Sequence, residues 1–175
     1  MKNGAIAIHR LSKLDEPILR ALSGLLVDVV DEGASIGFLA PLTTEAANAY
    51  WSHVHVEDVL LWTAMIDGQL VGSVQVHLAA KANAVHRAEV AKLMVHPDYR
   101  RRGIGERLMG VAEEACKNEG RSLIVLDTRE SDPSNALYKK LGYIMAGHIP
   151  GYARSSSGSL DGTVIYYKPL PHASN

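Results

Sequence analysis

The chain of 175 residues contains little cysteine, little net charge and no long hydrophobic run. Its single cysteine, Cys116, excludes a disulfide framework and a cysteine-based metal cluster. The formal net charge of −1 provides no overall field to attract nucleic acid or an anionic membrane surface, so any anion-binding site must be local. We therefore expect neither nucleic acid nor a membrane as a partner.

The hydrophobic runs of the sequence also predict no targeting segment and no membrane-spanning segment. No stretch approaches the roughly 20 consecutive apolar residues that a membrane-spanning helix needs. The apolar run in MKNGAIAIHRLSK at the N-terminus is too short for the core of a signal peptide. These absences predict a cytoplasmic protein. The hydrophobic content of 47% predicts a real core, and the length suits one domain over residues 1–175.

Hydrophobic periodicity and turn residues predict an alternation of strands and helices. Strands are expected on both sides of an Asp67-Gly68 turn within 59–79, and also at 5–11, 88–95, 122–128, 143–149 and 162–170. Helices are expected at 15–33, 43–58, 104–119 and 132–141. The order βααβββαβαββ predicts an α/β (α+β) fold with a mixed central β-sheet flanked by helices. The continuous apolar run at 122–128 predicts a strand buried on both faces.

The segment YRRRGIGERLM (99–109) concentrates cations and glycines at the start of a predicted helix. A helix N-terminus carries unpaired N–H groups and partial positive charge, which suit a phosphate. Gly103 and Gly105 allow the main chain to approach an anion closely. Three side chains can neutralise its charge, namely Arg100, Arg101 and Arg102. The segment therefore predicts an anion site, the alternative being a solvated basic turn.

Three pieces of the sequence carry a family resemblance. RRRGIG (100–105) resembles the R/Q-x-x-G-x-G/A loop of the GNAT superfamily of acetyl-CoA-dependent N-acetyltransferases. NALYKKLGY (135–143) resembles that superfamily's N-x-x-x-Y-x-x-x-G-F/Y pattern, and KLMVHPDYRRRGIG (92–105) has its strand-then-loop lead-in. The order of elements agrees along nearly the whole chain. The resemblance implies a GNAT-like fold, with acetyl-CoA as cofactor.

Further segments are similar to one branch of that superfamily. GASIGFLA (33–40), HRAEVAKLMV (86–95) and PGY (150–152) resemble the tabtoxin-resistance acetyltransferases, which inactivate a β-lactam toxin. This resemblance indicates the branch of the superfamily more than the acceptor itself. Because members of the superfamily often dimerise through their last strands, it also implies a homodimer.

The resemblance further implies how the cofactor is held. The pyrophosphate is expected on the main chain from Arg101 through Ile104 to Gly105. The pantetheine arm is expected to pair like an added strand with the main chain of Leu93, Met94 and Val95. Asn135 is expected to contact the arm or the adenosine side, and Tyr138 occupies the position that faces the sulfur.

Direct attack in a ternary complex requires a neutral amine and a proton for the leaving thiolate. Glu89 lies in an otherwise apolar strand, and Asp127 lies at the C-terminal end of a strand, where open sheets place ligand sites. Both are candidate bases, and the sequence leaves open which one acts. Tyr138 is the candidate proton donor, and a main-chain N–H near Leu93 or Met94 is expected to hold the oxyanion.

Each of these catalytic assignments has a structural alternative. Glu89 could pair with Arg87 or Lys92, Asp127 could belong to a turn, and Tyr138 could serve packing. Cys116 lies on the apolar face of its predicted helix and is expected in the core rather than as a nucleophile. Trp51 and Trp62 are likewise expected in the core. The scattered histidines lack metal-ligand spacing, so no metal is expected.

The segment after the first helix and the last hairpin are expected to form the wall of the site that binds the acceptor. Its candidate residues are Asp31, Glu32, Ser35 and Tyr152. The wall lacks a broad acidic or aromatic track for a peptide, which favours a small polar amine. Two other functions stay open: acetylation of a protein lysine or N-terminus, and a non-catalytic module that binds acyl-CoA.

Overall fold

The computed structural model describes residues 4–56 and 58–171. Its elements follow the expected order, with one short 3-10 turn in addition. They are β1 (Ala7–Leu11), α1 (Glu16–Asp31), α2 (Thr44–Ser52), β2 (Val59–Ile66), β3 (Gln69–Leu78), β4 (Arg87–Val95), η1 (Pro97–Tyr99), α3 (Ile104–Asn118), β5 (Leu123–Arg129), α4 (Ser134–Lys140), β6 (Ile144–Arg154) and β7 (Leu160–Pro169). Among these, no helix is long and apolar enough to cross a membrane.

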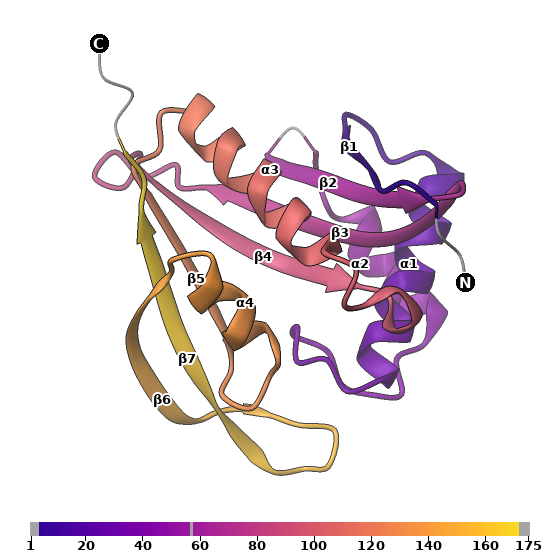
Figure 1. Ribbon diagram of the computed structural model, residues 1–175. Helices are drawn as coiled ribbons and strands as arrows, with labels where there is room; N and C mark the ends of the chain where they lie inside the picture. The colour runs from indigo at the N-terminus through magenta and orange to yellow at the C-terminus, as the bar shows by residue number, and fades with distance from the viewer. Residues whose placement is uncertain (1–3, 57, 172–175) are drawn as a thin grey trace.

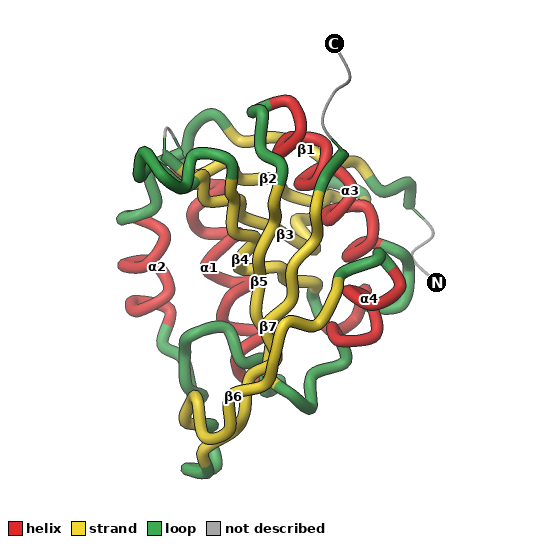
Figure 2. Tube along the Cα trace, turned by 90° about the vertical axis from the view of Figure 1, so that its left-hand side faces the viewer, coloured by secondary structure: helices red, strands yellow, loops and turns green. Residues whose placement is uncertain are grey.

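The strands form one mixed sheet in the order β1-β2-β3-β4-β5-β7-β6. The pair β4–β5 is parallel, and the other neighbouring pairs are antiparallel. Helices α1 and α2 cover one face of the sheet, and α3 and α4 cover the other (Figures 1 and 2). The predicted fold, a mixed sheet flanked by helices in a GNAT-like order, is confirmed.

Two hydrophobic cores hold the helices to the sheet. Leu108, Ala112 and Cys116 form the buried stripe of α3, at the spacing expected of an amphipathic helix. Trp51 of α2 is fully buried against α1 on the other face. Burial of a large apolar side chain contributes about 1.5–3 kcal/mol. Cys116 and both tryptophans are therefore core residues, as predicted, and burial raises the pKa of the Cys116 thiol to about 11.

Helix α2 ends earlier than the sequence pattern predicts. It runs from Thr44 to Ser52 rather than to residue 58, and residue 57 lies outside the described residues. Thr43 caps the start of the helix, accepting a hydrogen bond from the Ala46 N–H at 3.1 Å. The residues that follow Ser52 include valines, which favour a helix weakly, and the chain turns towards β2.

The last hairpin is longer than predicted. Strand β6 continues to Arg154 and β7 begins at Leu160, so the loop expected at 154–162 shrinks to a turn at 155–159. A register shift between Ile149 and Ala153 lets β6 pass through Pro150 and still pair again with β7. The hairpin therefore extends beyond the body of the sheet (Figure 1).

Strand β5 is not buried on both faces, which corrects the prediction for 122–128. Ile124 and Leu126 are buried, whereas Val125 is half-buried and Asp127 is exposed. The reason is that β4 and β5 diverge. They pair from Arg87–Leu123 to Glu89–Val125, and beyond these residues the two strands separate (Figure 1).

Candidate active site

A cleft of about 700 Å³ opens where β4 and β5 separate. Its walls come from the second half of β4, the end of β5, the start of α3, the segment after α1 and the start of α4. This position agrees with the general placement of ligands at the carboxyl ends of strands in open sheets. Twelve of the predicted site residues line it: Glu32, Ser35, Leu93, Met94, Val95, Arg100, Arg101, Gly103, Ile104, Gly105, Asp127 and Tyr138.

The start of α3 provides one end of the cleft with main-chain donors. Gly103 is the N-cap residue with φ +78°, and no side chain caps the first turn. The N–H groups of that turn thus remain available to an anion. The positive end of the helix and the two arginines beside it favour binding of an anion there. A Cβ on Gly105 would lie 3.2 Å from Leu137 Cδ2, so glycine there keeps α3 close to α4.

Strand β4 provides a free main-chain edge along the cleft. Residues Val90 to Val95 line the cleft after the strand has lost β5 as its neighbour. On its other side β4 continues to pair with β3, as in the pairs Ser73–Met94 and Gly72–Val95. An extended ligand can therefore add to β4 without disturbing the sheet.

Tyr138 of α4 combines packing with access to the cleft. Its ring lies 5.8 Å from that of Tyr143 and 5.9 Å from that of Tyr166, centroid to centroid, and it lines the cleft. Burial raises the pKa of the Tyr138 phenol well above its usual range, and the negative charge of Asp132 adds to this rise. The hydroxyl is therefore protonated at neutral pH.

The two candidate bases lie in different surroundings. Asp127 lines the cleft, and its Oδ2 accepts a hydrogen bond from the Thr163 hydroxyl at 3.0 Å. Glu89 is exposed and pairs across the sheet with His77, outside the set of residues that line the cleft. Burial lowers the pKa of His77, an effect that Glu89 opposes. The geometry thus gives Asp127 the better access to a ligand.

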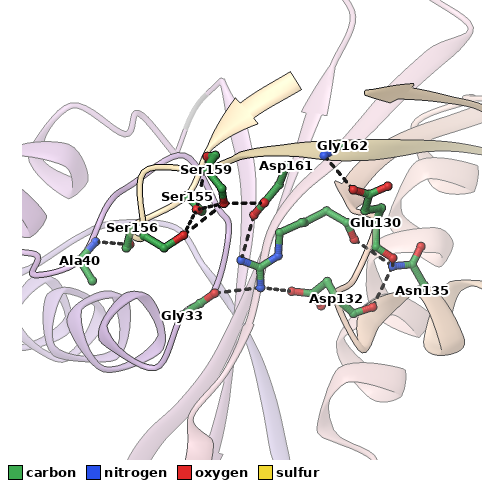
Figure 3. Close-up of polar contacts among 12 residues, drawn as sticks. Gly33, Ala40, Glu130, Asp132, Asn135, Ser155, Ser156, Ser159, Asp161 and Gly162 are labelled. Carbon is green, nitrogen blue, oxygen red and sulfur yellow. Dashed lines mark hydrogen bonds and ion pairs between the residues drawn. The ribbon is translucent and has the colours of Figure 1, made fainter. Parts of the chain in front are cut away.

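Arg129, at the end of β5, joins three segments over one end of the cleft. Its guanidinium donates to the Gly33 carbonyl at 3.0 Å and lies 3.7 Å from Asp161 and 3.9 Å from Asp132. Figure 3 shows Gly33, Asp132 and Asp161 converging from different elements. The same figure shows Ala40, whose N–H donates to the Ser156 hydroxyl at 2.9 Å. The segment between α1 and α2 is therefore bound to the β6–β7 hairpin.

These features match those of a known family. A sequence model described as the acetyltransferase (GNAT) family matches residues 23–143 of the chain. The chain belongs to the GNAT family of acetyltransferases. It is an N-acetyltransferase, and the acyl donor of this family is acetyl-CoA. The free donors at the start of α3 and the open edge of β4 fit a long ligand with a phosphate head.

Relatives of this GNAT protein include enzymes named for different acceptors. It is 30% identical over 129 residues to an uncharacterised N-acetyltransferase of Azospirillum brasilense. This match covers 72% of this chain and 77% of the relative. It is 27% identical to a putative ribosomal-protein bS18-alanine N-acetyltransferase of Bacillus subtilis, with 72% and 80% covered. It is 23% identical to a spermidine N(1)-acetyltransferase of Escherichia coli, with 60% and 56% covered.

Solved structures share the fold. The structure of yncA from Salmonella typhimurium, a putative acetyltransferase with its cofactor acetyl-CoA, superimposes with a TM-score of 0.79 at 17% identity. The match covers 97% of both chains. At this identity the likeness establishes the fold of the GNAT protein.

Five predicted site residues are not among those that line the cleft. Asp31 Oδ1 accepts the Leu42 N–H at 3.0 Å and ties the segment after α1 to its helix. Arg102 lies over the Tyr99 ring, 5.0 Å from its centroid. Tyr152 is exposed on the hairpin. Together with Glu89 and Asn135, these residues are outside the set that lines the cleft.

Asn135 holds the loop between β5 and α4 through its side-chain amide. Its Nδ2 donates to the carbonyls of Arg129 at 3.0 Å and Asp132 at 2.8 Å, and its Oδ1 accepts from the Tyr166 hydroxyl at 2.8 Å. The amide thus fastens the loop between β5 and α4 to the core through Tyr166, and Figure 3 shows its contacts within that loop. It positions the start of α4, and with it Tyr138, rather than contacting the cleft.

Sequence reasoning did not select Lys92 and Arg129, which both line the cleft. The signal for Lys92 was available, because it is a charged residue inside the apolar strand AEVAKLMV, as Glu89 is. Arg129 offered no such signal. Its contacts depend on residues 96 positions earlier and 32 positions later in the chain.

Proposed function

We propose that this protein acetylates the amine of a small molecule by direct attack in a ternary complex. The observation that carries the proposal is that the segment after α1, which lines the cleft, is bound both to the β6–β7 hairpin and to Arg129 of β5. Asp127 and residues of the segment after α1 line the same cleft of about 700 Å³, and we expect that bound acetyl-CoA leaves room there for a small acceptor rather than for an extended chain. A small amine fits such a space better than a protein tail.

The chain's own residues supply the remaining chemistry. Acetyl-CoA, when bound, supplies an activated acetyl thioester. The first turn of α3 would hold its phosphates, and the edge of β4 at Leu93 and Met94 would hold its arm and polarise the thioester carbonyl. Asp127 would take the proton of the acceptor amine, directly or through water, and the protonated Tyr138 hydroxyl would donate one to the thiolate.

Among small amines, a tabtoxin-type β-lactam is the first candidate. The segments GASIGFLA, HRAEVAKLMV and PGY support this choice. Two of them, 33–40 and 86–95, contribute residues to the cleft. Acetylation of a protein N-terminus is the second candidate, because one relative is named for a ribosomal-protein substrate.

Two measurements test the proposal. Calorimetric titration of the purified protein with acetyl-CoA, with NAD and ATP as controls, should give selective binding. Thiol release from acetyl-CoA should then be faster with small amines, tabtoxinine-β-lactam among them, than with peptides that carry a free N-terminus or lysine. Faster turnover of the peptides would replace the proposal by the second candidate. Binding of acetyl-CoA without turnover of any amine would reduce the protein to a binding module.

A further inference from the structure

Lys92 lies at an irregular point of β4. Its φ is +50°, a left-handed value, and the pairing with β3 shifts register between Ser73 and Gln75. A bulge of this kind redirects a side chain. The Lys92 ammonium lies 5.7 Å from the centroid of the Phe38 ring and 5.6 Å from that of Tyr50, half-buried between the segment after α1 and helix α2.

The ammonium of Lys92 makes no hydrogen bond and no ion pair with residues 4–56 or 58–171. It lies over the two aromatic rings and close to Gly37. The other cation at this end of the cleft, Arg129, is already bound to Gly33, Asp132 and Asp161. Lys92 is therefore a cation in the cleft wall that keeps its hydrogen-bonding capacity for a ligand.

Charged and titratable groups surround Lys92 on several elements. Asp127 of β5 and Glu89 of β4 attract its positive charge, and His77 of β3 and Tyr50 of α2 lie on the same face. Burial is the larger influence and lowers the pKa of Lys92. Half-burial of an ammonium without an anionic partner is unfavourable unless a ligand compensates it.

The cleft thus offers opposite charges to one ligand, Asp127 on one strand and Lys92 on the next. We propose that Lys92 selects acceptors by their charge. The preferred acceptor carries an anionic group, such as a carboxylate, beside the amine that faces Asp127. This inference rests on the proposed function. Lys92 would bind the anion and repel acceptors that carry several positive charges, such as polyamines.

Matched acceptors separate this inference from a general preference for small amines. A panel of free amino acids is compared with the corresponding amino acid amides, which keep the amine and the shape and lose only the negative charge. The amides have the less basic amine, so intrinsic reactivity favours them. We expect the protein to prefer the acid in kcat/KM, and to turn over spermidine and putrescine poorly.

Three variants then assign the preference to Lys92. In Lys92→Met, the ratio of kcat/KM for an acid to kcat/KM for its amide should fall about tenfold or more. A fall of this size is expected when a hydrogen bond to a charged group is lost. Lys92→Arg keeps the charge and should retain the preference. Lys81→Met removes an exposed lysine outside the cleft and serves as the matched control. An unchanged ratio in Lys92→Met, or better turnover of polyamines than of acids, would overturn the inference.

A binding measurement decides the matter if no amine is turned over. Calorimetric titration of the complex with coenzyme A, using the same acids and amides, should show tighter binding of the acids to the natural protein than to Lys92→Met. Absence of turnover with this difference present would reject the proposed transfer and keep the charge selection. Equal binding by both proteins would reject the charge selection.

Discussion

Arg129 donates a hydrogen bond of 3.0 Å to the carbonyl of Gly33, and so joins the end of β5 to the segment after α1. The same guanidinium faces Asp161 of β7, and the side chain is largely buried. Three parts of the chain that are remote in sequence meet at this arginine (Figure 3). Arg129 therefore helps to fix the segment after α1, which lines the cleft.

Replacement of Arg129 by alanine should loosen this connection. The Gly33 carbonyl and two carboxylates would lose a shared cation, and we expect a loss of unfolding free energy of about 1–3 kcal/mol. KM for small acceptors should rise, and turnover of peptides should increase relative to them. Urea unfolding and thiol-release assays measure both effects. Arg154→Ala, on the same hairpin but bonded only within its own turn at Gly158, is the control.

Replacement of Gly103 by valine should prevent binding of acetyl-CoA while the protein stays folded. Valine has space there, because no neighbouring atom lies within 4 Å of the position that its Cβ would take, but φ +78° strains it by about 1–2 kcal/mol. The strain disturbs the first turn of α3, where the phosphates would bind. Gly110→Ala, within the same helix, should leave affinity unchanged and stabilise the helix slightly. Calorimetry showing equal affinity for Gly103→Val would contradict the phosphate site.

Replacement of Tyr138 by phenylalanine should slow transfer without weakening acetyl-CoA binding. The ring can keep its packing on Tyr143 and Tyr166, while the buried hydroxyl that would donate a proton is lost. We expect kcat to fall about a hundredfold, within the range for general acid catalysis. Tyr143→Phe alters the same aromatic cluster outside the cleft lining and should retain kcat. A similar kcat in both variants would make Tyr138 a packing residue.

Asp127→Asn and Glu89→Gln should distinguish the two candidate bases. Asp127 lines the cleft and Glu89 does not, so Asp127→Asn should lower kcat/KM about a hundredfold and Glu89→Gln much less. A larger loss in Glu89→Gln, measured with the same acceptor, would assign the base to Glu89.

The stability effect of Lys92 should depend on pH. Because burial lowers its pKa in the folded state, the ammonium opposes folding at neutral pH, where Lys92 is charged in both states. This effect should fade as the pH rises through the folded-state pKa towards the ordinary value of about 10.4. Lys92→Met should therefore raise Tm at pH 7, with a gap to the natural protein that narrows at alkaline pH. Lys81→Met should show no such narrowing. A difference in Tm that stays constant with pH would mean that the charge of Lys92 does not destabilise the folded state.

The order of elements followed from the sequence because local signals agreed with the fold. Asp67-Gly68 marks the β2–β3 turn with two positive φ values, and Thr43 caps α2, as their residue types suggest. The stripe of Leu108, Ala112 and Cys116 identifies the buried side of α3. Such features depend on neighbours within a few positions, and a single sequence contains them.

The sequence alone therefore determined the strand and helix order, the glycine and arginine segment at the start of α3, and the family. The tertiary structure decided which side chains meet in the cleft. The point at which β4 and β5 separate exposes Asp127 and leaves Glu89 outside, and a bulge directs Lys92 towards Phe38 and Tyr50. Arg129 finds its partners across long loops. Periodicity describes only which face of an element is apolar, whereas these contacts depend on how far strands diverge and where loops return.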